Sequence, residues 1–436
     1  MASVRALRIG LCAALCVSAI ACSGGGGTTA ASGSSSGGVG GSSSSSGGTS
    51  SSSSSSSGGT SSSSSGAGTG NVAAVIIDQG PSNASVNTLF TSVTVCVPGS
   101  TTSCQTINHI QVDTGSYGLR ILAPVLTLTL PVVTLTGGNS LAECTQFVDG
   151  YSWGPVVSAD VQIAGETAHS LPMQVIGDSR FTTIPTTCSN TGGTQEDTVA
   201  TFGANGILGV GPFELDCGDC DTVARFYYAC AATCSETTVP LNMQVANPVT
   251  RFTTDNNGVI VVLPSVAAGG ASNVSGSLIF GIDTQSNNQS GTQTVLTVDS
   301  NANLLITFNG QSLANSFIDS GSNGIYFNDS SISKCTAPPN DPTSQIVNFY
   351  CPANTLSLGP VSIQGMNGVM ANNLTFSVGN AQTMLNNNFD AYPQLAGTNP
   401  NTGSFDFGLA FFYGKRVAVA VENDKTSVGT GPYIAF

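Results

Sequence analysis

Two short stretches of the chain repeat one pattern of acidic, hydroxyl and glycine residues. The first is "VDTGSYGL", residues 112–119, and the second is "IDSGSNGI", residues 318–325. Each contains one aspartate, Asp113 or Asp319, and no further Asp-Thr/Ser-Gly tripeptide occurs in the sequence. Two carboxyl groups within hydrogen-bond reach share one proton over a wide pH range. One carboxyl can then act as a base while the other acts as an acid.

The residues that follow each aspartate suit such a pair. They are a hydroxyl residue, a glycine and a serine in both copies: Thr114, Gly115 and Ser116, and Ser320, Gly321 and Ser322. The glycines allow a sharp turn and a close approach of the backbone. The hydroxyl groups of Thr114 and Ser320 are suited to hydrogen bonds with the backbone of the opposite loop. Those of Ser116 and Ser322 are suited to hydrogen bonds with the outer carboxylate oxygens. A single such motif would be an ordinary turn, because these residue types favour turns. Its repetition favours a catalytic pair.

The elements that must position the two aspartates are predicted to be strands. Segments such as "NVAAVIID", "GVIVVLPSV" and "RVAVAVEN" are short and β-branched, with Gly, Asn, Asp and Ser between them. This composition is typical of β-strands bounded by turns. Helical periodicity is scarce, and the best candidate is "DTVARFYYACA", residues 221–231. The pattern predicts an all-β protein with many strands.

At these residues the sequence resembles the pepsin-like aspartic proteases, in which two homologous β lobes each contribute one aspartate to a shared cleft. Each lobe of that family also has two apolar residues and a glycine beside the aspartate, and here those glycines are Gly209 and Gly408. The similar features cover essentially all of residues 72–436. The resemblance therefore implies a bilobal fold with an N-terminal lobe over 72–250 and a C-terminal lobe over 251–436.

The resemblance also implies a reaction. Asp113 and Asp319 would be the catalytic residues of an aspartic endopeptidase. One ionised carboxylate would take a proton from a bound water that attacks the peptide carbonyl, while the protonated partner stabilises the oxyanion. The substrate would be an extended peptide or protein in the cleft. No cofactor or metal is expected.

The flap, the hairpin that closes over substrate in that family, departs from the family's pattern. The family's flap Tyr falls at Phe147, although Tyr151 is close enough to reach inward instead. The Trp that supports that Tyr is replaced near Arg120, and Trp153, the single Trp of the chain, is a candidate to compensate. These changes keep an alternative open, in which the protein binds a peptide or a cell-envelope partner without cleaving it.

The N-terminal residues are predicted to direct export. Residues 1–21 combine two arginines with a short apolar run, as in signal peptides. Small residues before Cys22 resemble the lipobox of bacterial lipoproteins, whose Cys is lipidated, although Ala19 stands where Leu is usual. Residues 22–71 add an uncharged Gly/Ser tether that cannot repay the entropy of ordering. We expect a cell-envelope protein, with an outer-membrane lipoprotein favoured over a secreted one. The whole resembles an uncharacterised bacterial lipoprotein-type branch.

The charge and the histidines exclude other classes of function. The formal net charge is −14, which disfavours a nucleic-acid partner. A Ser-His-Asp triad would depend on one of two isolated histidines, His109 or His169. The expected partners are the substrate and a membrane reached through the lipid. The protein itself is expected to be a monomer.

The cysteines of the folded part predict five disulfides in an oxidising compartment. The ten are Cys96, Cys104, Cys144, Cys188, Cys217, Cys220, Cys230, Cys234, Cys335 and Cys351. Local loops are expected from pairing 96 with 104 and 335 with 351. The cluster between 217 and 234 is predicted to form nested bridges, 217 to 234 and 220 to 230. Its spacing also resembles that of a four-Cys zinc site, which remains the rival interpretation.

Overall fold

The computed structural model describes residues 70–190, 193–341 and 344–436. The predicted signal peptide, the lipidation site Cys22 and almost all of the tether lie outside the described residues. None of the helices in the described ranges has the length and apolar character needed to cross a bilayer.

Nearly all regular structure in this part of the chain is β. The larger sheet contains β1 (Val72–Ile77), β2 (Phe90–Cys96), β3 (Cys104–Asp113), β4 (Tyr117–Leu122), β5 (Ser140–Gln146), β6 (Gly150–Ile163), β7 (Glu166–Ile176), β8 (Thr194–Gln195), β9 (Gly206–Val210), β10 (Tyr227–Cys230), β11 (Cys234–Glu236), β12 (Gly258–Val262), β13 (Val274–Phe280), β14 (Val295–Thr297), β22 (Arg416–Ala420) and β25 (Tyr433–Ala435). The second sheet contains β15 (Leu304–Phe308), β16 (Gln311–Ile318), β17 (Ile325–Tyr326), β18 (Leu356–Gln364), β19 (Met370–Val378), β20 (Ala396–Gly397) and β21 (Asp406–Phe407). A short hairpin is formed by β23 (Lys425–Thr426) and β24 (Gly429–Thr430).

The helices are short and lie between strands. The α-helices are α1 (Thr186–Ser189), α2 (Val199–Phe202) and α3 (Ala381–Leu385). Single 3₁₀ turns are η1 (Ala123–Val125), η2 (Leu241–Met243), η3 (Pro248–Arg251), η4 (Gln345–Asn348) and η5 (Leu409–Phe411). The helix expected over residues 221–231 is absent, and that prediction was wrong. Its last residues form strand β10, which pairs with β5 on one side and β11 on the other. Sheet pairing outweighs the weak local helical preference.

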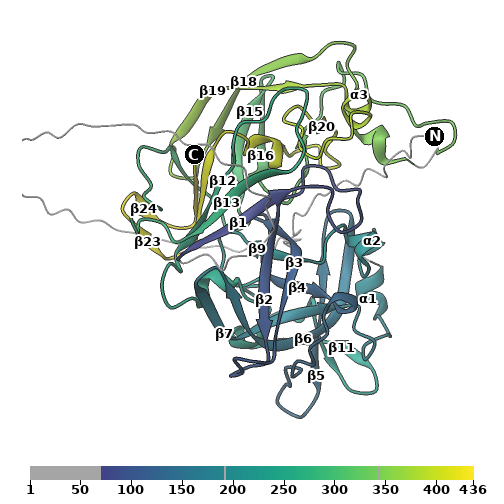
Figure 1. Cartoon of the computed structure of the whole chain (residues 1–436), viewed down its shortest axis with the longest axis vertical. Helices are drawn as coiled ribbons and strands as arrows, with labels where there is room; N and C mark the ends of the chain where they lie inside the picture. Colours follow the sequence, from purple (N-terminus) through teal and green to yellow (C-terminus); the bar gives the residue numbers. More distant parts are fainter. Residues whose placement is uncertain (1–69, 191–192, 342–343) are drawn as a thin grey trace, which may run out of the picture. The chain divides into compact units, whose positions relative to one another are not determined.

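The larger sheet joins the two halves of the chain. Strand β1 pairs antiparallel with β13 over its whole length, from Val72 opposite Ile279 to Ile77 opposite Val274. Strand β13 in turn pairs with β12, and β12 pairs with β22 (Figure 1). The first strand of the N-terminal half is thus hydrogen-bonded to the C-terminal half. The predicted lobe boundary at residue 250 stays a prediction.

Each half repeats one arrangement of four strands around its aspartate. In the N-terminal half, β3 pairs parallel with β9, β4 pairs antiparallel with β9, and β4 pairs parallel with β7. In the C-terminal half, β16, β17, β20 and β21 make the same three pairings, with β21 in the role of β9 and β20 in that of β7. Asp113 ends β3 and Asp319 directly follows β16. This internal repeat confirms the predicted fold class, all-β with two homologous lobes in the pepsin-like arrangement.

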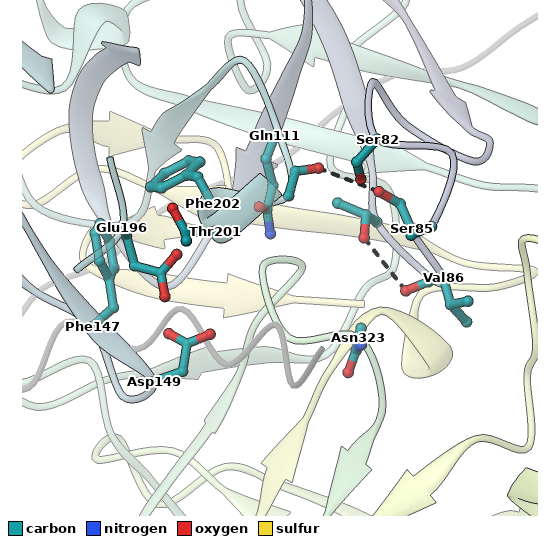
Figure 2. A pocket seen from close by; sticks show the side chains of 13 residues that line it. Ser82, Ser85, Val86, Gln111, Phe147, Asp149, Glu196, Thr201, Phe202 and Asn323 are labelled. Carbon is teal, nitrogen blue, oxygen red and sulfur yellow. Dashed lines mark hydrogen bonds between the residues drawn. The ribbon is translucent and has the colours of Figure 1, made fainter. Parts of the chain in front are cut away.

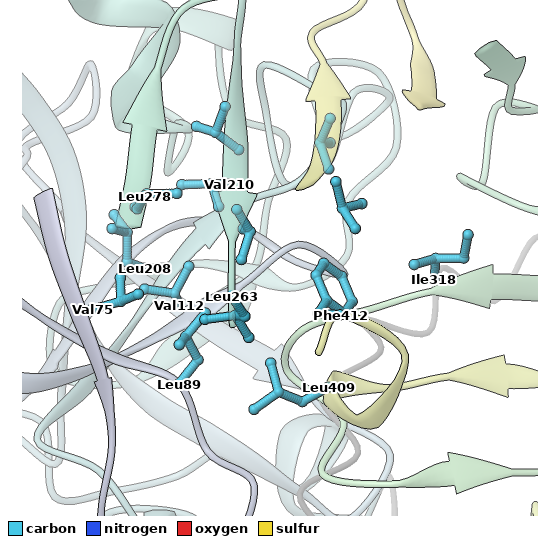
Figure 3. Packing of buried hydrophobic residues seen from close by; sticks show 14 of the residues in the cluster. Val75, Leu89, Val112, Leu208, Val210, Leu263, Leu278, Ile318, Leu409 and Phe412 are labelled. Carbon is cyan, nitrogen blue, oxygen red and sulfur yellow. The ribbon is translucent and has the colours of Figure 1, made fainter. Parts of the chain in front are cut away.

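One hydrophobic cluster runs through both lobes. Val112 and Leu208, which precede the aspartate and the glycine of the N-terminal lobe, are fully buried in it. Ile318 and Leu409 of the C-terminal lobe are buried in the same cluster (Figure 3). Because apolar residues anchor the strand ends on which both aspartates sit, the carboxyl groups are held on a closely packed base.

Five disulfides form among the described cysteines. The local bridges Cys96–Cys104 and Cys335–Cys351 are confirmed, and Cys144–Cys188 links β5 to α1. The nested pairing between 217 and 234 was wrong, since the structure has Cys217–Cys220 and Cys230–Cys234 instead. The second of these bridges joins directly opposed residues of β10 and β11, so strand pairing brings its two sulfurs together. All four thiols of the rival zinc arrangement are consumed by these two disulfides.

Candidate active site

The carboxyl groups of Asp113 and Asp319 meet between the two lobes. Both side chains are fully buried, and they lie close enough that each carboxyl group affects the pKa of the other. Each has the same local support: Gly115 N–H donates to Asp113 Oδ1 at 2.8 Å, and Gly321 N–H donates to Asp319 Oδ1 at 2.7 Å. The sequence repeat therefore becomes one site with two near-equivalent halves.

The serines of the two motifs hold the outer carboxylate oxygens, as the sequence predicts. Ser116 Oγ donates a short hydrogen bond to Asp113 Oδ2. Ser322 Oγ donates to Asp319 Oδ2 at 3.0 Å. Each carboxyl thus receives one backbone and one hydroxyl hydrogen bond from its own loop, which fixes its plane.

The other hydroxyl residues of the motifs reach across to the opposite loop. Ser320 N–H donates to Thr114 Oγ1 at 2.9 Å, and Thr114 N–H donates to Ser320 Oγ at 3.1 Å. Ser320 Oγ also donates to the carbonyl of Val112 at 2.9 Å. These buried bonds join the two loops directly and set the separation of the aspartates.

The two motif glycines are required by the opposing carboxyl groups. A Cβ on Gly115 would lie 2.6 Å from Asp319 Cγ, and a Cβ on Gly321 would lie 2.5 Å from Asp113 Oδ1. Both distances are far below van der Waals contact, so a methyl group here would occupy the place of the partner carboxyl. Glycine at these positions is a condition for the pair to form.

The lobe glycines predicted from the resemblance lie directly behind the aspartate loops. A Cβ on Gly209 would lie 2.5 Å from the backbone nitrogen of Tyr117, and one on Gly408 would lie 2.5 Å from the backbone carbonyl oxygen of Ser322. Strands β9 and β21 can therefore pack against the loops only because these residues have no side chain. Gly209 pairs directly with Asp113 in the sheet, as the order of features in the sequence implies.

Burial raises the pKa of both aspartates, and the interaction between the two carboxyl groups makes their pKa values differ. For Asp113 burial and the neighbouring charge of Asp319 both raise the pKa. For Asp319 burial raises the pKa, and the hydrogen bond from Asp113 opposes that rise. Because the two carboxyl groups titrate together, the shared proton belongs to the pair. The pair is thus suited to hold one proton across the acidic range.

Residues 67–436 match the family described as "Protein of unknown function (DUF3443)". The chain belongs to this family. No curated protein matches the DUF3443 chain. Among solved structures, an aspartic proteinase from Irpex lacteus is similar, with a TM-score of 0.45 and 15% sequence identity over 84% of this chain and 96% of that one.

A pocket of the DUF3443 chain opens beside the aspartate pair. Its volume is about 60 Å³. It is lined by Ser82, Ala84, Ser85, Val86, Thr88, Gln111, Phe147, Asp149, Glu196, Thr201, Phe202, Gly203 and Asn323. Figure 2 shows Phe147, Asp149 and Glu196 together on one side and Ser82 and Ser85 on the other. Neither catalytic candidate lines the pocket, but Gln111 and Asn323, which lie close to them in the chain, do.

The expected flap is the hairpin of β5 and β6. Phe147 is at its turn, where its N–H donates to the Gly150 carbonyl at 2.7 Å, and its ring lines the pocket. Tyr151 and Trp153 do not line the pocket. They are buried in a separate cluster, where Trp153 packs edge-on against Tyr228 and donates from Nε1 to the Phe181 carbonyl at 2.8 Å. Of the three predicted flap residues, the structure brings only Phe147 to the pocket.

A buried ionic network takes the place of the expected aromatic support for the flap. Arg120 of β4 donates to Glu143 Oε1 at 2.6 Å and to Asp216 Oδ2 at 2.7 Å. It also donates from Nε to Thr145 Oγ1 at 2.8 Å. Glu143 and Thr145 belong to flap strand β5, and Arg120 follows the Asp113 loop. The network therefore ties the base of the flap to the strand that carries the aspartate loop onward.

Sequence reasoning missed two residues that the fold brings to the site. Gln111 donates from Nε2 to the carbonyl of Gly321 at 2.9 Å, and it also lines the pocket. Asp406 lies close to Asp319, whose charge raises the pKa of Asp406. Neither belongs to a motif. For Asp406 the available signal was an acidic residue in "FDFG", where the equivalent segment of the other lobe, "ILG", is apolar.

Proposed function

We propose that this DUF3443 chain is an aspartic endopeptidase. The observation that carries the proposal is the close approach of two buried aspartates, each held by its own loop and joined to the other by reciprocal loop contacts. Two carboxyls that share one proton provide a base and an acid at one point. Their position on packed strand ends keeps this geometry without reorganisation.

The proposed reaction uses one water and no cofactor. Asp319, as carboxylate, takes a proton from the water, and the oxygen adds to the carbonyl carbon of the peptide bond. Asp113 gives its proton to the carbonyl oxygen as charge develops there. The proton now on Asp319 passes to the peptide nitrogen as the C–N bond breaks. Asp113 then recovers its proton from the new carboxyl group, which restores the pair.

Substrate entry requires the flap to open. Both aspartates are fully buried, neither of them lines the pocket, and the pocket volume is about 60 Å³. Ligand sites for small molecules typically occupy several hundred Å³. We expect the hairpin turn at Phe147 to move away from Phe202, whose ring centre lies 6.0 Å from that of Phe147, and to admit an extended peptide.

The test is cleavage of a mixed peptide library across the acidic and neutral pH range. Wild type should cleave with a bell-shaped pH dependence and an optimum on the acidic side. Asp113→Asn and Asp319→Asn should each abolish cleavage while the far-ultraviolet circular dichroism spectrum is unchanged. Phe147→Ala should weaken turnover less than either change, because the flap positions substrate and transfers no proton. Activity retained by either Asn variant would contradict the proposal.

The second candidate function is peptide binding without cleavage. The full burial of both aspartates, neither of which lines the pocket, favours it, because a binding module needs no access to the carboxyl groups. Here wild type would cleave nothing at any pH. It would bind an extended peptide with equal affinity when either aspartate is replaced by Asn. Isothermal titration with the library peptides separates this outcome from catalysis.

We also propose that the protein works as a monomer on a membrane of the cell envelope, held by lipid on Cys22. A Gly/Ser tether of this length would allow reach on the order of 40 Å from the anchor. Cys22→Ala should abolish incorporation of labelled palmitate and release the protein from the membrane fraction. Labelling that survives this substitution would contradict the anchor.

A further inference from the structure

Asp406 is a third buried carboxyl beside the aspartate pair. Its side chain is fully buried, and neither of its carboxylate oxygens accepts a hydrogen bond of normal length and angle. No basic side chain is paired with it in the described part of the chain. An ionised carboxylate in such a place would be costly, so its presence calls for an explanation.

The internal repeat of the fold shows what Asp406 replaces. In the N-terminal lobe, Gln111 of β3 pairs with Ile207 of β9, two positions before Asp113 and Gly209. In the C-terminal lobe, Phe317 of β16 pairs with Asp406 of β21 in the same place. Ile207 packs against the flap residue Phe147 in a small apolar cluster. The C-terminal lobe has a carboxyl where the same position of the other lobe is filled by an aliphatic side chain.

The groups around Asp406 belong to the active site. Asp319 follows β16 on one side, and Tyr326 pairs with Asp406 from β17 on the other. Ser322, whose hydroxyl donates to Asp319 Oδ2 at 3.0 Å, is also close enough to Asp406 to lower its pKa. Burial and the charge of Asp319 act in the opposite direction and raise the pKa of Asp406 well above its usual value. Burial has the largest effect and the charge of Asp319 the next, and both favour a proton on Asp406.

We infer that Asp406 is a positioning residue that keeps its proton and donates it in a hydrogen bond to Ser322 Oγ. A hydroxyl oxygen that accepts from Asp406 can direct its own hydrogen only toward Asp319. The order of donors is then Asp406, Ser322, Asp319, and every bond points toward the negative charge of the pair. Asp406 itself touches neither water nor substrate in this scheme.

The protonation state of Asp406 limits the pH range over which the Asp113–Asp319 pair can act. If Asp406 lost its proton, Ser322 would be drawn to donate to it and would abandon Asp319. A second negative charge would also raise the pKa of Asp319 and so reduce the fraction of Asp319 that is ionised, and able to act as a base, at a given pH. The step from Asp406 to activity rests on the proposed endopeptidase function, whereas its protonation does not.

The first experiment measures protonation directly, without any substrate. Infrared difference spectra of protein labelled with ¹³C-aspartate distinguish a protonated carboxyl from a carboxylate. At neutral pH, the spectrum of wild type minus Asp406→Asn should contain one protonated carboxyl. The matched control is Asp255→Asn, another buried aspartate, whose carboxyl accepts hydrogen bonds from Thr284 and Gln285 and lies outside the site. A carboxylate band in the Asp406 difference spectrum would overturn the inference.

The second experiment measures turnover against pH in two variants. Asp406→Ile copies the N-terminal lobe and removes the donor, so kcat should fall about tenfold with little change in KM. Asp406→Asn keeps an N–H donor for Ser322 and cannot ionise. It should restore kcat to within about twofold and extend the alkaline limb of the pH profile upward. Equal pH profiles for wild type and both variants would overturn the positioning role. If wild type cleaves nothing, the endopeptidase proposal fails, and the infrared result still decides whether Asp406 holds a proton.

Discussion

Thr114 and Ser320 exchange backbone-to-hydroxyl hydrogen bonds between the two aspartate loops, at 2.9 and 3.1 Å. Both residues are buried, and the bonds run between the lobes. The contact lies one residue from each aspartate, so any change in the lobe arrangement at this point would move the carboxyl groups. The reciprocal geometry connects the stability of the fold to the distance between Asp113 and Asp319.

Removing this exchange should destabilise the protein in a coupled way. Thr114→Val and Ser320→Ala each leave a buried N–H without its acceptor, which costs about 1–3 kcal/mol in free energy of unfolding. The double variant should lose less than the sum, because both bonds belong to one network. Urea unfolding of the four proteins measures the coupling. Strict additivity would mean that the two hydroxyls act independently.

Alanine at either motif glycine should remove the aspartate pair without unfolding the lobes. In Gly115→Ala or Gly321→Ala the new methyl group competes for space with the opposite carboxyl. We expect loss of peptide cleavage and a fall in stability of about 1–3 kcal/mol from overpacking. Gly269→Ala is the control, since a Cβ there meets nothing within 4 Å. Full activity of the Gly115 variant would show that the carboxyls need not touch.

Asp113→Asn should make the protein more stable at neutral pH. The folded pKa of Asp113 is raised by burial and by Asp319 above the ordinary 3.8. A raised folded pKa contributes stability that is complete below the unfolded pKa and is lost as pH rises through the folded value. Asn cannot ionise, so the variant should gain about 1–2 kcal/mol at pH 7. Thermal unfolding should show this advantage shrinking below pH 4. A stability advantage of Asp113→Asn that grows as the pH falls would contradict a raised pKa for Asp113.

The Arg120 network should be essential to the base of the flap. Arg120→Met leaves Glu143 and Asp216 without their cation, and both carboxyl groups are largely buried. Breaking a buried ionic group by removing one partner costs about 3–5 kcal/mol. Adding Glu143→Gln and Asp216→Asn should recover much of that loss in chemical denaturation. Failure of the triple variant to recover would indicate that the packing of the Arg120 side chain matters more than its charge.

The disulfides should differ in their contribution to stability according to loop length. Cys144 and Cys188 are 44 residues apart, whereas Cys217 and Cys220 are 3 apart. The chain-entropy account gives about 4 kcal/mol for the long loop and about 2 kcal/mol for the short one. Replacing each pair by Ser and comparing unfolding midpoints tests this order. Peptide mapping should find 217 joined to 220, and a 217 to 234 bridge would contradict the structure.

The sequence by itself predicted the pair of aspartates and determined the class of fold. The Asp113 and Asp319 motifs are recognisable because each residue type in them has a separate chemical task. Strand content follows from β-branched residues between turn formers, which act over a few neighbours. The bridge from Cys96 to Cys104 is of the same local kind, since a short hairpin holds both sulfurs together. Interactions within a few residues leave their pattern in the order of the chain.

Only the tertiary structure decided what meets across the sheets. The spacing of Cys230 and Cys234 fits several pairings, and the register of β10 with β11 selects one. Arg120 finds Glu143 and Asp216 because β4, β5 and the segment after β9 converge in the buried interior. Asp406 comes to Asp319 through the parallel pairing of β16 with β21, which joins segments far apart in the chain. Such contacts depend on strand register and on burial, and both are properties of the whole packed fold.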